Sequence, residues 1–439
     1  MPAVSRFRGL HSLLKGAVYV SGDADLFWGG HSFKKQEDFP RFDYNISSWF
    51  LAHTVPFMTS LILEMPELFS DPLPLLKSAE LAEQEVVLSK RQCGSLLAVM
   101  FFCGYHHTSQ PQPLRSKRDG SFHPLVNYDS ILLCLNQKRV ENQCVAKVCM
   151  LMNYFERSRI SMSKHNFSIK RLRSLHPLSI EQWKGSEIPL TNLKVLSEGG
   201  IHNAGPLALH VDFANKFIGG GVMRRGSVQE EIMFSVCPEL LVSLIFCERM
   251  MESEAILLTG AEMFSNYTGY SSNTTYDGNC PEEDIVSRIA IDAISYRGRD
   301  GPMNQYRTGT ILRELNKAYV GFNHNFPATP GDEAMSVADE SQDLFNDSVA
   351  STSNGDSNGS SSHNSPVATG NWGCGAFGGH IQLKSMLQWC AAALCGREVL
   401  YYTFKDPNAE GLEEISELLM QQAVTVGKLS NLLITVLSE

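Results

Sequence analysis

The chain has 439 residues, of which 43% are hydrophobic and 19% are charged, and its formal net charge is −10. This composition is typical of a globular protein and excludes a collagen, a coiled coil and a wholly disordered chain. The length predicts two or three domains, or one large domain with an accessory module. The longest apolar run, residues 96–103, is far shorter than the roughly 20 residues of a membrane-spanning helix, so no membrane contact is expected.

Charge and cysteine usage limit the classes of partner. Residues 332–366 contribute −7 to the net charge and contain no basic residue, which leaves about −3 for the rest of the chain. No direct nucleic-acid binding is expected from this balance, although it does not exclude a local site for a polyanion. The 11 cysteines include no C-x-x-C pair and no zinc-finger spacing, so no metal site is predicted and the thiols are interpreted as those of a nuclear or cytosolic protein.

Residues 1–180 are predicted to form a mostly helical accessory domain. Apolar residues in the segments 93–101 and 145–155 recur at the spacing of a helix with one buried face. These stripes are interpreted as packing faces without chemistry of their own. Residues 1–22 contain three basic residues and no acidic one, a weak likeness to a mitochondrial presequence, but a frayed start is the preferred interpretation.

Residues 190–439 are predicted to form a second domain, in which short β-rich runs alternate with helical stretches. This alternation is typical of an α/β fold with a mixed sheet flanked by helices. Ligands of such folds usually lie at the ends of strands, on the loops that lead into helices. The β-rich runs cover residues 193–196, 207–213, 255–258, 285–294 and 399–404, and the helical stretches cover residues 229–236, 240–250, 309–319 and 381–394.

The second domain is interrupted by a segment at residues 332–366 that is rich in serine, asparagine, glycine and acidic residues. It contains few large apolar side chains, so it cannot bury enough surface to offset the loss of chain entropy. The segment is therefore predicted to be a disordered acidic insertion.

The first candidate site follows the predicted strand at residues 207–213. Glycine allows positive φ angles and close backbone approach, so that N–H groups can surround a phosphate or a sugar. Acidic residues at the start of the next helix add groups capable of acid–base chemistry. The strand delivers Asp212 and Asn215, the loop contains Gly219, Gly220 and Gly221, and the helix opens with Gln229, Glu230 and Glu231.

A purely structural interpretation competes with the catalytic one. Ser227 and Glu230 have the spacing of a capping box, in which Ser227 is the N-cap residue and the Glu230 side chain accepts a hydrogen bond from its backbone N–H group. Taken alone, Glu230 is more often such a cap than a catalytic group. Consecutive helical residues point about 100° apart, so Glu230 and Glu231 can reach one reacting atom only if the helix start is irregular.

A second glycine cluster, at residues 368–380, precedes the helix predicted to begin at Ile381. Gly373, Gly375, Gly378 and Gly379 again suit a loop of inward-pointing N–H groups at a helix N-terminus, which is the usual setting of a diphosphate site. Either loop alone is equally well explained as a tight turn. Two such loops with an acidic pair favour a ligand that carries both phosphate and sugar.

Four motifs together resemble the poly(ADP-ribose) glycohydrolases. They are V-D-F-A-N at residues 211–215, G-G-G-x7-Q-E-E at 219–231, Y-T-G-Y at 267–270 and A-T-G-N-W-G-C-G-A-F-G-G at 368–379. The resemblance implies a macrodomain-like fold and exo-hydrolysis of the ribose–ribose bonds of poly(ADP-ribose), with ADP-ribose as product and without metal or cofactor. It also implies that the partners are the polymer and ADP-ribosylated proteins, in the DNA damage response of nucleus or cytoplasm.

The resemblance assigns roles residue by residue. Glu231 would be the acid/base, Glu230 would hold the leaving ribose, and Asp212 would support both from beneath. Tyr270 would stack on adenine and Phe404 would pack against the distal ribose. The further substrate-binding residues are Asn215, Gly219, Gly220, Gly221, Gln229, Gly373, Cys374, Gly375, Ala376 and Phe377. This assignment requires Glu231 to lie against the backbone of residues 219–221 and not in bulk solvent.

The sequence departs from the family pattern at a few positions. His202 stands where relatives commonly have an acid that reads adenine, and His380 stands where aspartate is usual. Arg224 and Arg225 replace small residues in the catalytic loop, as phosphate contacts or as a solvated tip. Two rival functions stay open: an inactive reader or scaffold of the same fold, and a hydrolase of mono-ADP-ribosylated proteins.

Overall fold

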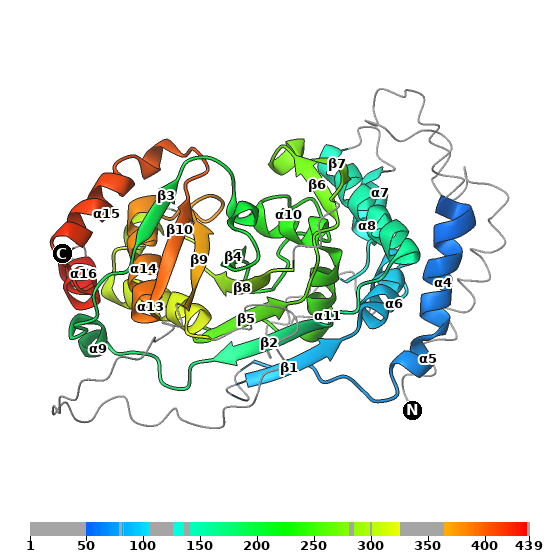
Figure 1. Ribbon diagram of the computed structural model, residues 1–439, viewed down its shortest axis with the longest axis horizontal. Coiled ribbons are helices and arrows are strands. Elements are labelled where there is room, and N and C mark those ends of the chain that lie inside the picture. The colour runs from blue at the N-terminus through cyan, green and yellow to red at the C-terminus, as the bar shows by residue number, and fades with distance from the viewer. Residues whose placement is uncertain are drawn as a thin grey trace, which may run out of the picture.

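The computed structural model, shown in Figure 1, describes residues 50–78, 81, 83–105, 126–135, 141–280, 285–298, 301–324 and 364–436. The possible presequence at residues 1–22 lies outside this part of the chain. Most of the predicted insertion at residues 332–366 lies outside it as well. Its last three residues, however, belong to strand β9 (Asn364–Gly370), so the predicted end of the insertion is wrong.

An eight-stranded mixed sheet organises the described chain, with the strand order β1-β2-β5-β8-β4-β9-β10-β3. Neighbours from β8 to β3 are parallel, and β1, β2 and β5 join antiparallel at one end. The strands not yet given are β1 (Glu83–Leu88), β2 (Phe167–Arg173), β3 (Leu193–Leu196), β4 (Leu209–Ala214), β5 (Glu254–Thr259), β8 (Ser287–Asp292) and β10 (Arg397–Tyr402).

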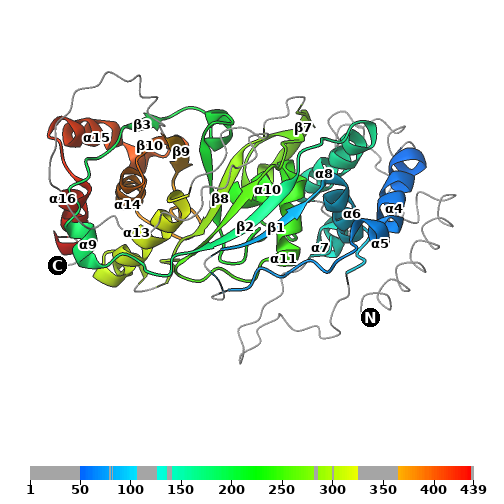
Figure 2. The ribbon, with the colours of Figure 1, turned by 60° about the horizontal axis from the view of Figure 1, so that its bottom comes forward.

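Two apolar cores cover the two faces of this sheet. Alternate residues of a strand point to opposite faces, and β5 shows the division clearly because Ala255 and Leu257 belong to one core while Ile256 and Leu258 belong to the other. Helices α13 (Thr308–Phe322) and α14 (Ile381–Leu394) cover the first face, and α10 (Gln229–Val236) covers the second (Figures 1 and 2). The domain is therefore a three-layer α/β/α sandwich.

The helical region packs on the same face as α10 and shares its core. The region is mostly helical, as predicted, and it also contributes β1 and β2, which extend the sheet beyond β5. The main helices here are α4 (Val55–Leu63), α6 (Lys90–Phe101), α7 (Asp129–Leu135) and α8 (Asn142–Ile160). Both predicted apolar stripes lie in helices, α6 and α8, and each helix is buried on more than one side.

Most predicted elements of the second domain are present. The predicted helices at residues 229–236 and 381–394 coincide with α10 and α14. The predicted helix at 240–250 is wrong beyond its first turns, because the chain forms η4 (Pro238–Val242) and α11 (Ser243–Phe246) and then becomes extended at Cys247, which bridges to Leu76. The mixed sheet flanked by helices is confirmed.

A small hairpin and several short helices complete the described chain. A separate two-stranded hairpin, β6 (Ser265–Thr268) and β7 (Thr275–Asn279), stands beside α8 and α10 (Figure 1). No helix among the described residues is long and apolar enough to cross a bilayer. The remaining elements are η2 (Phe50–Thr54), α5 (Met65–Leu68), α9 (Ile180–Lys184), η3 (Ile201–Ala204), η5 (Ser271–Asn273), α12 (Gly301–Asn304), η6 (Pro407–Ala409), α15 (Leu412–Gln421), α16 (Val426–Asn431) and η7 (Leu432–Val436).

The shared sheet predicts that the second domain does not fold alone. A fragment beginning at residue 180 lacks β2, so the buried strand β5 becomes an exposed edge and the core beneath α10 loses its cover. We expect this fragment to be insoluble or aggregated on size-exclusion chromatography, while the full chain elutes as a defined species. A soluble fragment with a cooperative thermal transition would contradict this prediction.

Candidate active site

The candidate site lies at the carboxyl ends of three neighbouring strands, β4, β9 and β10. A cleft of about 400 Å³ opens there, which is large enough for a nucleotide-sized ligand. Its walls include the start of α10, the second glycine loop and the β6–β7 hairpin, whereas the predicted site residues Gly219, Gly220 and Gly221 are not among those that line it. Of the predicted site residues, Asn215, Gln229, Glu230, Glu231, Tyr270, Gly373, Cys374, Gly375, Ala376, Phe377 and Phe404 line it.

Gln229 attaches the first turn of α10 to strand β4. Its side-chain Oε1 accepts from the N–H group of Phe213 at 2.9 Å, and its Nε2 donates to the carbonyl of Val211 at 3.0 Å. The side chain therefore bonds to β4 beyond residue 210, where the described pairing of β4 with β9 ends. This bond pair sets the position of the helix start, and the predicted contact of Gln229 with substrate stays a prediction.

The first glycine loop holds the two glutamates and does not present all its N–H groups to the cleft. Gly219 donates to Glu230 Oε1 at 2.6 Å, and Asn215 donates to Glu230 Oε2 at 2.9 Å. Gly221 donates to Glu231 Oε1 at 2.8 Å. The required position of Glu231 against this loop is thus observed, and Gly219 and Gly221 act through the carboxylates.

The predicted capping box between Ser227 and Glu230 is wrong by one residue. The cap is Val228, whose N–H group donates to Glu231 Oε2 at 2.9 Å, and the Ser227 hydroxyl instead donates to Thr274 Oγ1. Because Glu231 folds back over the helix start while Glu230 reaches the β4 loop, both carboxyl groups meet beside Gly220. The helix nevertheless begins with a regular capping box between Val228 and Glu231, so the irregular helix start that the catalytic interpretation required is not observed.

Three carboxyl groups are buried together at this point. Asp212 lies on β4, is fully buried, and neither of its carboxyl oxygens has a hydrogen-bond partner among the described residues. Burial raises the pKa of Asp212 well above its usual value, and the negative charge of Glu231 raises it further. Burial likewise raises the pKa of Glu230, with Asp212 and Glu231 adding to the effect. Burial therefore favours the neutral forms of Asp212 and Glu230.

The second glycine loop follows β9 and leads into α14. Gly373 has a φ angle of +73°, and an added Cβ would lie 2.6 Å from Ala293 Cβ, so only glycine fits. The loop is closed by a hydrogen bond from the Gly379 N–H group to the Gly373 carbonyl. Within the described chain, the N–H groups of Gly375, Ala376 and Phe377 have no acceptor. They are available to an anionic ligand.

Trp372 and Lys384 support this loop from below. The Trp372 indole donates to the carbonyl of Ile291 at 2.9 Å, and Lys384 Nζ lies 3.6 Å from the centre of its ring. Lys384 also forms an ion pair with Glu314, and burial lowers its pKa well below the usual value. Lys384 could not be predicted from the sequence, because a single lysine within an apolar helix belongs to no motif.

Two aromatic rings form the outer edge of the cleft. Tyr270 and Phe404 have ring centres 5.2 Å apart, and their side chains are 40% and 61% exposed. Phe404 and Ser271 have φ angles of 54° and 57°, a left-handed conformation that non-glycine residues rarely adopt. Such strain is often found at binding sites, where it directs a side chain toward a ligand.

The departures from the family pattern lie in different surroundings. His202 lines the cleft with its ring centre 6.0 Å from that of Tyr267, and burial lowers its pKa. The backbone N–H group of His380 donates to Gln305 at 2.7 Å before α14 begins. Arg225 is exposed and forms an ion pair with Glu141 at 3.3 Å.

The fold and this geometry define a class: a macrodomain-type α/β protein whose cleft joins paired glutamates to a glycine loop with free N–H groups. Residues 180–411 match the family described as "Poly (ADP-ribose) glycohydrolase (PARG), Macro domain fold", and residues 43–171 match its helical domain. The chain belongs to the poly(ADP-ribose) glycohydrolase family.

Curated relatives extend this finding over most of the chain. It is 31% identical to poly(ADP-ribose) glycohydrolase 1 of Arabidopsis thaliana, over 88% of this chain and 78% of the relative. It is 32% identical to the probable poly(ADP-ribose) glycohydrolase 2 of that plant, over 90% and 79%. For poly(ADP-ribose) glycohydrolase 1 of Caenorhabditis elegans the identity is 30%, over 80% and 40%. The predicted family and the predicted glycosidase class are confirmed.

The contacts at Gly220 predict that this position tolerates no side chain. Its φ angle is +52°, and an added Cβ would lie 2.5 Å from Glu230 Oε2 and 2.7 Å from Glu231 Oε1. Displacing reacting groups by about 1 Å can cost about 10²-fold in rate, so we expect Gly220→Ala to lower kcat by about that factor in a polymer-hydrolysis assay.

Gly411→Ala is the matched control. Gly411 also has a positive φ angle, +79°, but a Cβ there meets nothing within 4 Å, and the residue caps α15 away from the cleft. It should share the backbone strain of about 1–2 kcal/mol and keep full activity. Equal kcat values for the two variants would show that the glutamates do not depend on the loop.

Proposed function

We propose that the chain shortens poly(ADP-ribose) from its ends and releases ADP-ribose, with Glu231 as the acid/base. The observation that supports this most is the position of the Glu231 carboxyl group, which lines the cleft while Gly221 and Val228 hold both of its oxygens. Glu231 donates a proton to the leaving ribose oxygen and then removes one from the attacking water.

The acid cluster supports a supply of protons at the cleft. The pKa values of Asp212 and Glu230 are both raised, chiefly by burial, which favours the neutral forms of these two acids beside Glu231. A bound diphosphate adds negative charge and removes water, and both effects favour the neutral form of a neighbouring carboxyl group. The same diphosphate stabilises positive charge that develops on the sugar, so a second flanking carboxylate is not needed.

Glu230 and Asp212 have positioning roles in this proposal. Glu230 links the β4 loop to the helix through Asn215 and Gly219, so it fixes the floor on which the leaving ribose rests. Asp212 lies beneath, is fully buried and does not line the cleft. Its proposed role is to support the two glutamates from beneath.

The nucleotide is proposed to lie between the second glycine loop and the aromatic edge. The free N–H groups of Gly375, Ala376 and Phe377 suit a diphosphate. Tyr270 and Phe404 line the opening with their rings in contact, and there Tyr270 stacks on adenine and Phe404 packs on the distal ribose. His202 faces the same space and replaces an acidic group there with one that burial keeps neutral.

Two other functions differ from this proposal: a reader of the polymer cleaves no bond, and a hydrolase of mono-ADP-ribosylated proteins cleaves a different one. A reader of the polymer would have no use for two glutamates held by four backbone N–H groups beside an anionic ligand. A hydrolase of mono-ADP-ribosylated proteins would release ADP-ribose from protein and leave the polymer intact. In cells we propose a role in the DNA damage response, in nucleus or cytoplasm, where buried thiols such as those of Cys93 and Cys237 stay reduced.

The Glu231→Gln variant tests the acid/base role. Glutamine keeps the shape of the side chain and an oxygen for one N–H donor, but it cannot exchange a proton. We expect kcat to fall by about 10²–10⁴-fold, with ADP-ribose affinity little changed by calorimetry. With the unaltered enzyme, labelled polymer should yield ADP-ribose monomers from the start of the reaction, and mono-ADP-ribosylated protein should yield none.

Glu239→Gln is the control for loss of a buried glutamate. Glu239 is 1% exposed and lies outside the cleft, where it pairs with Lys90. It should lower stability and leave kcat of the folded enzyme unchanged. Normal polymer cleavage by Glu231→Gln would rule out the mechanism, and release of ADP-ribose from the mono-modified protein alone would replace the proposed substrate.

The aromatic edge predicts a separate effect on binding. Stacking of a base on an aromatic side chain is worth about 1–3 kcal/mol by alanine substitution, so Tyr270→Ala should raise the Kd for ADP-ribose by roughly 5- to 150-fold and raise KM more than it lowers kcat. Tyr270→Phe retains the ring and should bind almost normally. If both variants lose the same affinity, the hydroxyl group and not the ring contacts the ligand.

A further inference from the structure

A lysine of the helical region reaches into the catalytic loop. Lys147 lies on α8, which packs against α10, and its side chain is almost fully buried at 2% exposure. Its Nζ donates to the carbonyls of Val222 and Arg224, each at 2.7 Å, and to the carbonyl of Gly226. The three acceptors lie in the turn that joins the first glycine loop to the helix of the two glutamates.

The chemistry of these contacts suits a charged ammonium group. A protonated lysine has three N–H donors and no acceptor, so three carbonyls satisfy it completely. Without them the buried charge would be costly, and without the lysine three carbonyl groups of one turn would point at each other. Lysine and turn therefore stabilise each other across the boundary between the helical region and the α/β domain.

The turn that Lys147 holds is in contact with Glu231. Gly221, which donates to Glu231 Oε1, bonds to Gly226 through the Gly226 N–H group at 3.2 Å. A Cβ added at Gly226 would lie 2.8 Å from the same Glu231 oxygen. Any shift of the 222–226 turn therefore moves the wall against which the carboxyl group rests.

We propose that Lys147 is a positioning residue through which the helical region fixes the 222–226 turn, and thereby the Glu231 carboxyl group, in the geometry that cleavage requires. The inference rests on the proposed role of Glu231. It gives the helical region a part in turnover, whereas its sequence showed only packing faces. Lys147 touches no reacting atom, so its effect falls on kcat and not on ligand affinity.

Helix α8 also holds the opposite wall of the cleft. Asn153 donates to the carbonyl of Phe264 and to Ser265 Oγ at the start of the β6–β7 hairpin. Arg157 donates to the carbonyls of Met263 and Cys280, which flank that hairpin. One helix thus bonds to the glutamate turn and to the hairpin that carries Tyr270, which is consistent with a supporting role for α8 as a whole.

The charged groups around Lys147 make its effect dependent on pH. Burial lowers its pKa to about 8, while Glu231 on α10, Cys144 on α8 and Cys134 on α7 oppose the decrease. At the exposed end of the turn, Arg225 pairs with Glu141. A neutral amine has only two N–H donors, so deprotonation leaves one of the three carbonyls without a partner.

This titration loosens the turn without unfolding the chain. The folded protein releases the Lys147 proton near pH 8, whereas an ordinary lysine releases it near 10.5. Between these values the unfolded chain binds more protons, so the contribution of this residue to the free energy of unfolding rises with pH. A loss of kcat in that range is therefore local.

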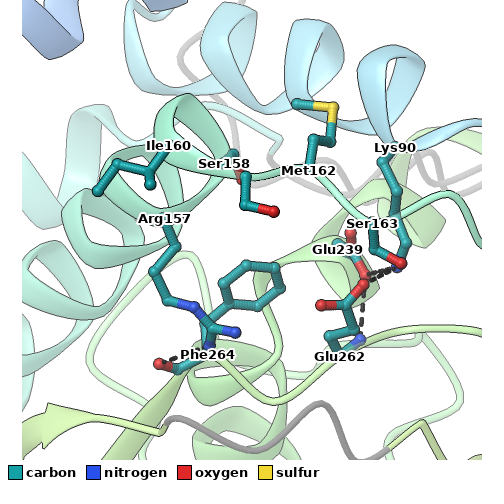
Figure 3. Close-up of a pocket in the computed structure, with 10 residues that line it drawn as sticks. Lys90, Arg157, Ser158, Ile160, Met162, Ser163, Glu239, Glu262 and Phe264 are labelled. Atoms are coloured by element: carbon teal, nitrogen blue, oxygen red, sulfur yellow. Dashed lines mark hydrogen bonds and ion pairs between the residues drawn. The ribbon is translucent and has the colours of Figure 1, made fainter.

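The test compares Lys147→Met with Lys90→Met. Lys90 is a second buried lysine of the helical region. It contacts Glu239, Glu262 and the carbonyl of Gly260 beside a small cavity that neither Glu230 nor Glu231 lines (Figure 3). Both variants should lower the Tm. Below both melting temperatures, Lys147→Met should lose about 10²-fold in kcat with ADP-ribose affinity unchanged, and Lys90→Met should retain the kcat of the unaltered enzyme.

Equal kcat values for these two variants would overturn the inference. A Lys147→Arg variant covers the case in which Lys147→Met does not fold, because a guanidinium group stays charged at all accessible pH values. The kcat of the unaltered enzyme should fall as pH rises through about 8, and in Lys147→Arg this decrease should move to higher pH. An unmoved decrease in Lys147→Arg would also overturn it.

The Glu231→Gln variant separates this inference from the proposed function. If Glu231→Gln is inactive while Lys147→Met behaves like Lys90→Met, Glu231 is the acid/base and Lys147 is only structural. If Glu231→Gln still cleaves the polymer, the proposed mechanism fails, whatever the lysine variants show.

Discussion

The arrangement of the site depends on four backbone N–H groups that hold two consecutive glutamates. Asn215 and Gly219 hold Glu230, and Gly221 and Val228 hold Glu231. Neighbouring residues of a regular helix point about 100° apart, so without these donors the two carboxyl groups would diverge. Hydrogen bonds from backbone groups hold each carboxyl group in place, and they set Glu230 beside the capping box of Val228 and Glu231.

The sheet brings these donors and the second glycine loop to one edge. Parallel strands β4, β9 and β10 all end beside the cleft, so the glutamate turn, the second glycine loop and Phe404 follow three adjacent strand ends. Gln229 joins the helix start to β4, and α8 supports the turn and the hairpin from outside. The helical region is thus part of the site as well as of the sheet.

Structure that depends on short contiguous motifs could be predicted from the sequence, and contacts between residues far apart in the sequence could not. The position of α10 and the approach of Glu231 to residues 219–221 were predicted from the glycines and the Q-E-E triplet. The cap was placed one residue early, because Ser227 fits the pattern but its hydroxyl is engaged by Thr274, 47 positions away. Strand β9 was missed because its first residues have the composition of the insertion. Lys147 gave no signal, since its three acceptors are backbone carbonyls 75 to 79 positions away.

An anionic substrate must bind beside three acids, and the described lining of the cleft offers a single fixed positive charge. Arg288 is the one arginine or lysine among the described residues that line it, and its guanidinium donates to the carbonyls of Ala261 and Val286. In the proposed complex the diphosphate is therefore left to neutral N–H groups of the second glycine loop. Raised pKa values at Asp212 and Glu230 favour the neutral forms of these acids and so reduce the repulsion. Burial of the acids thus serves binding and chemistry together, because a cleft lined with lysines would hold the anion but favour ionised carboxyl groups and leave no acid to donate.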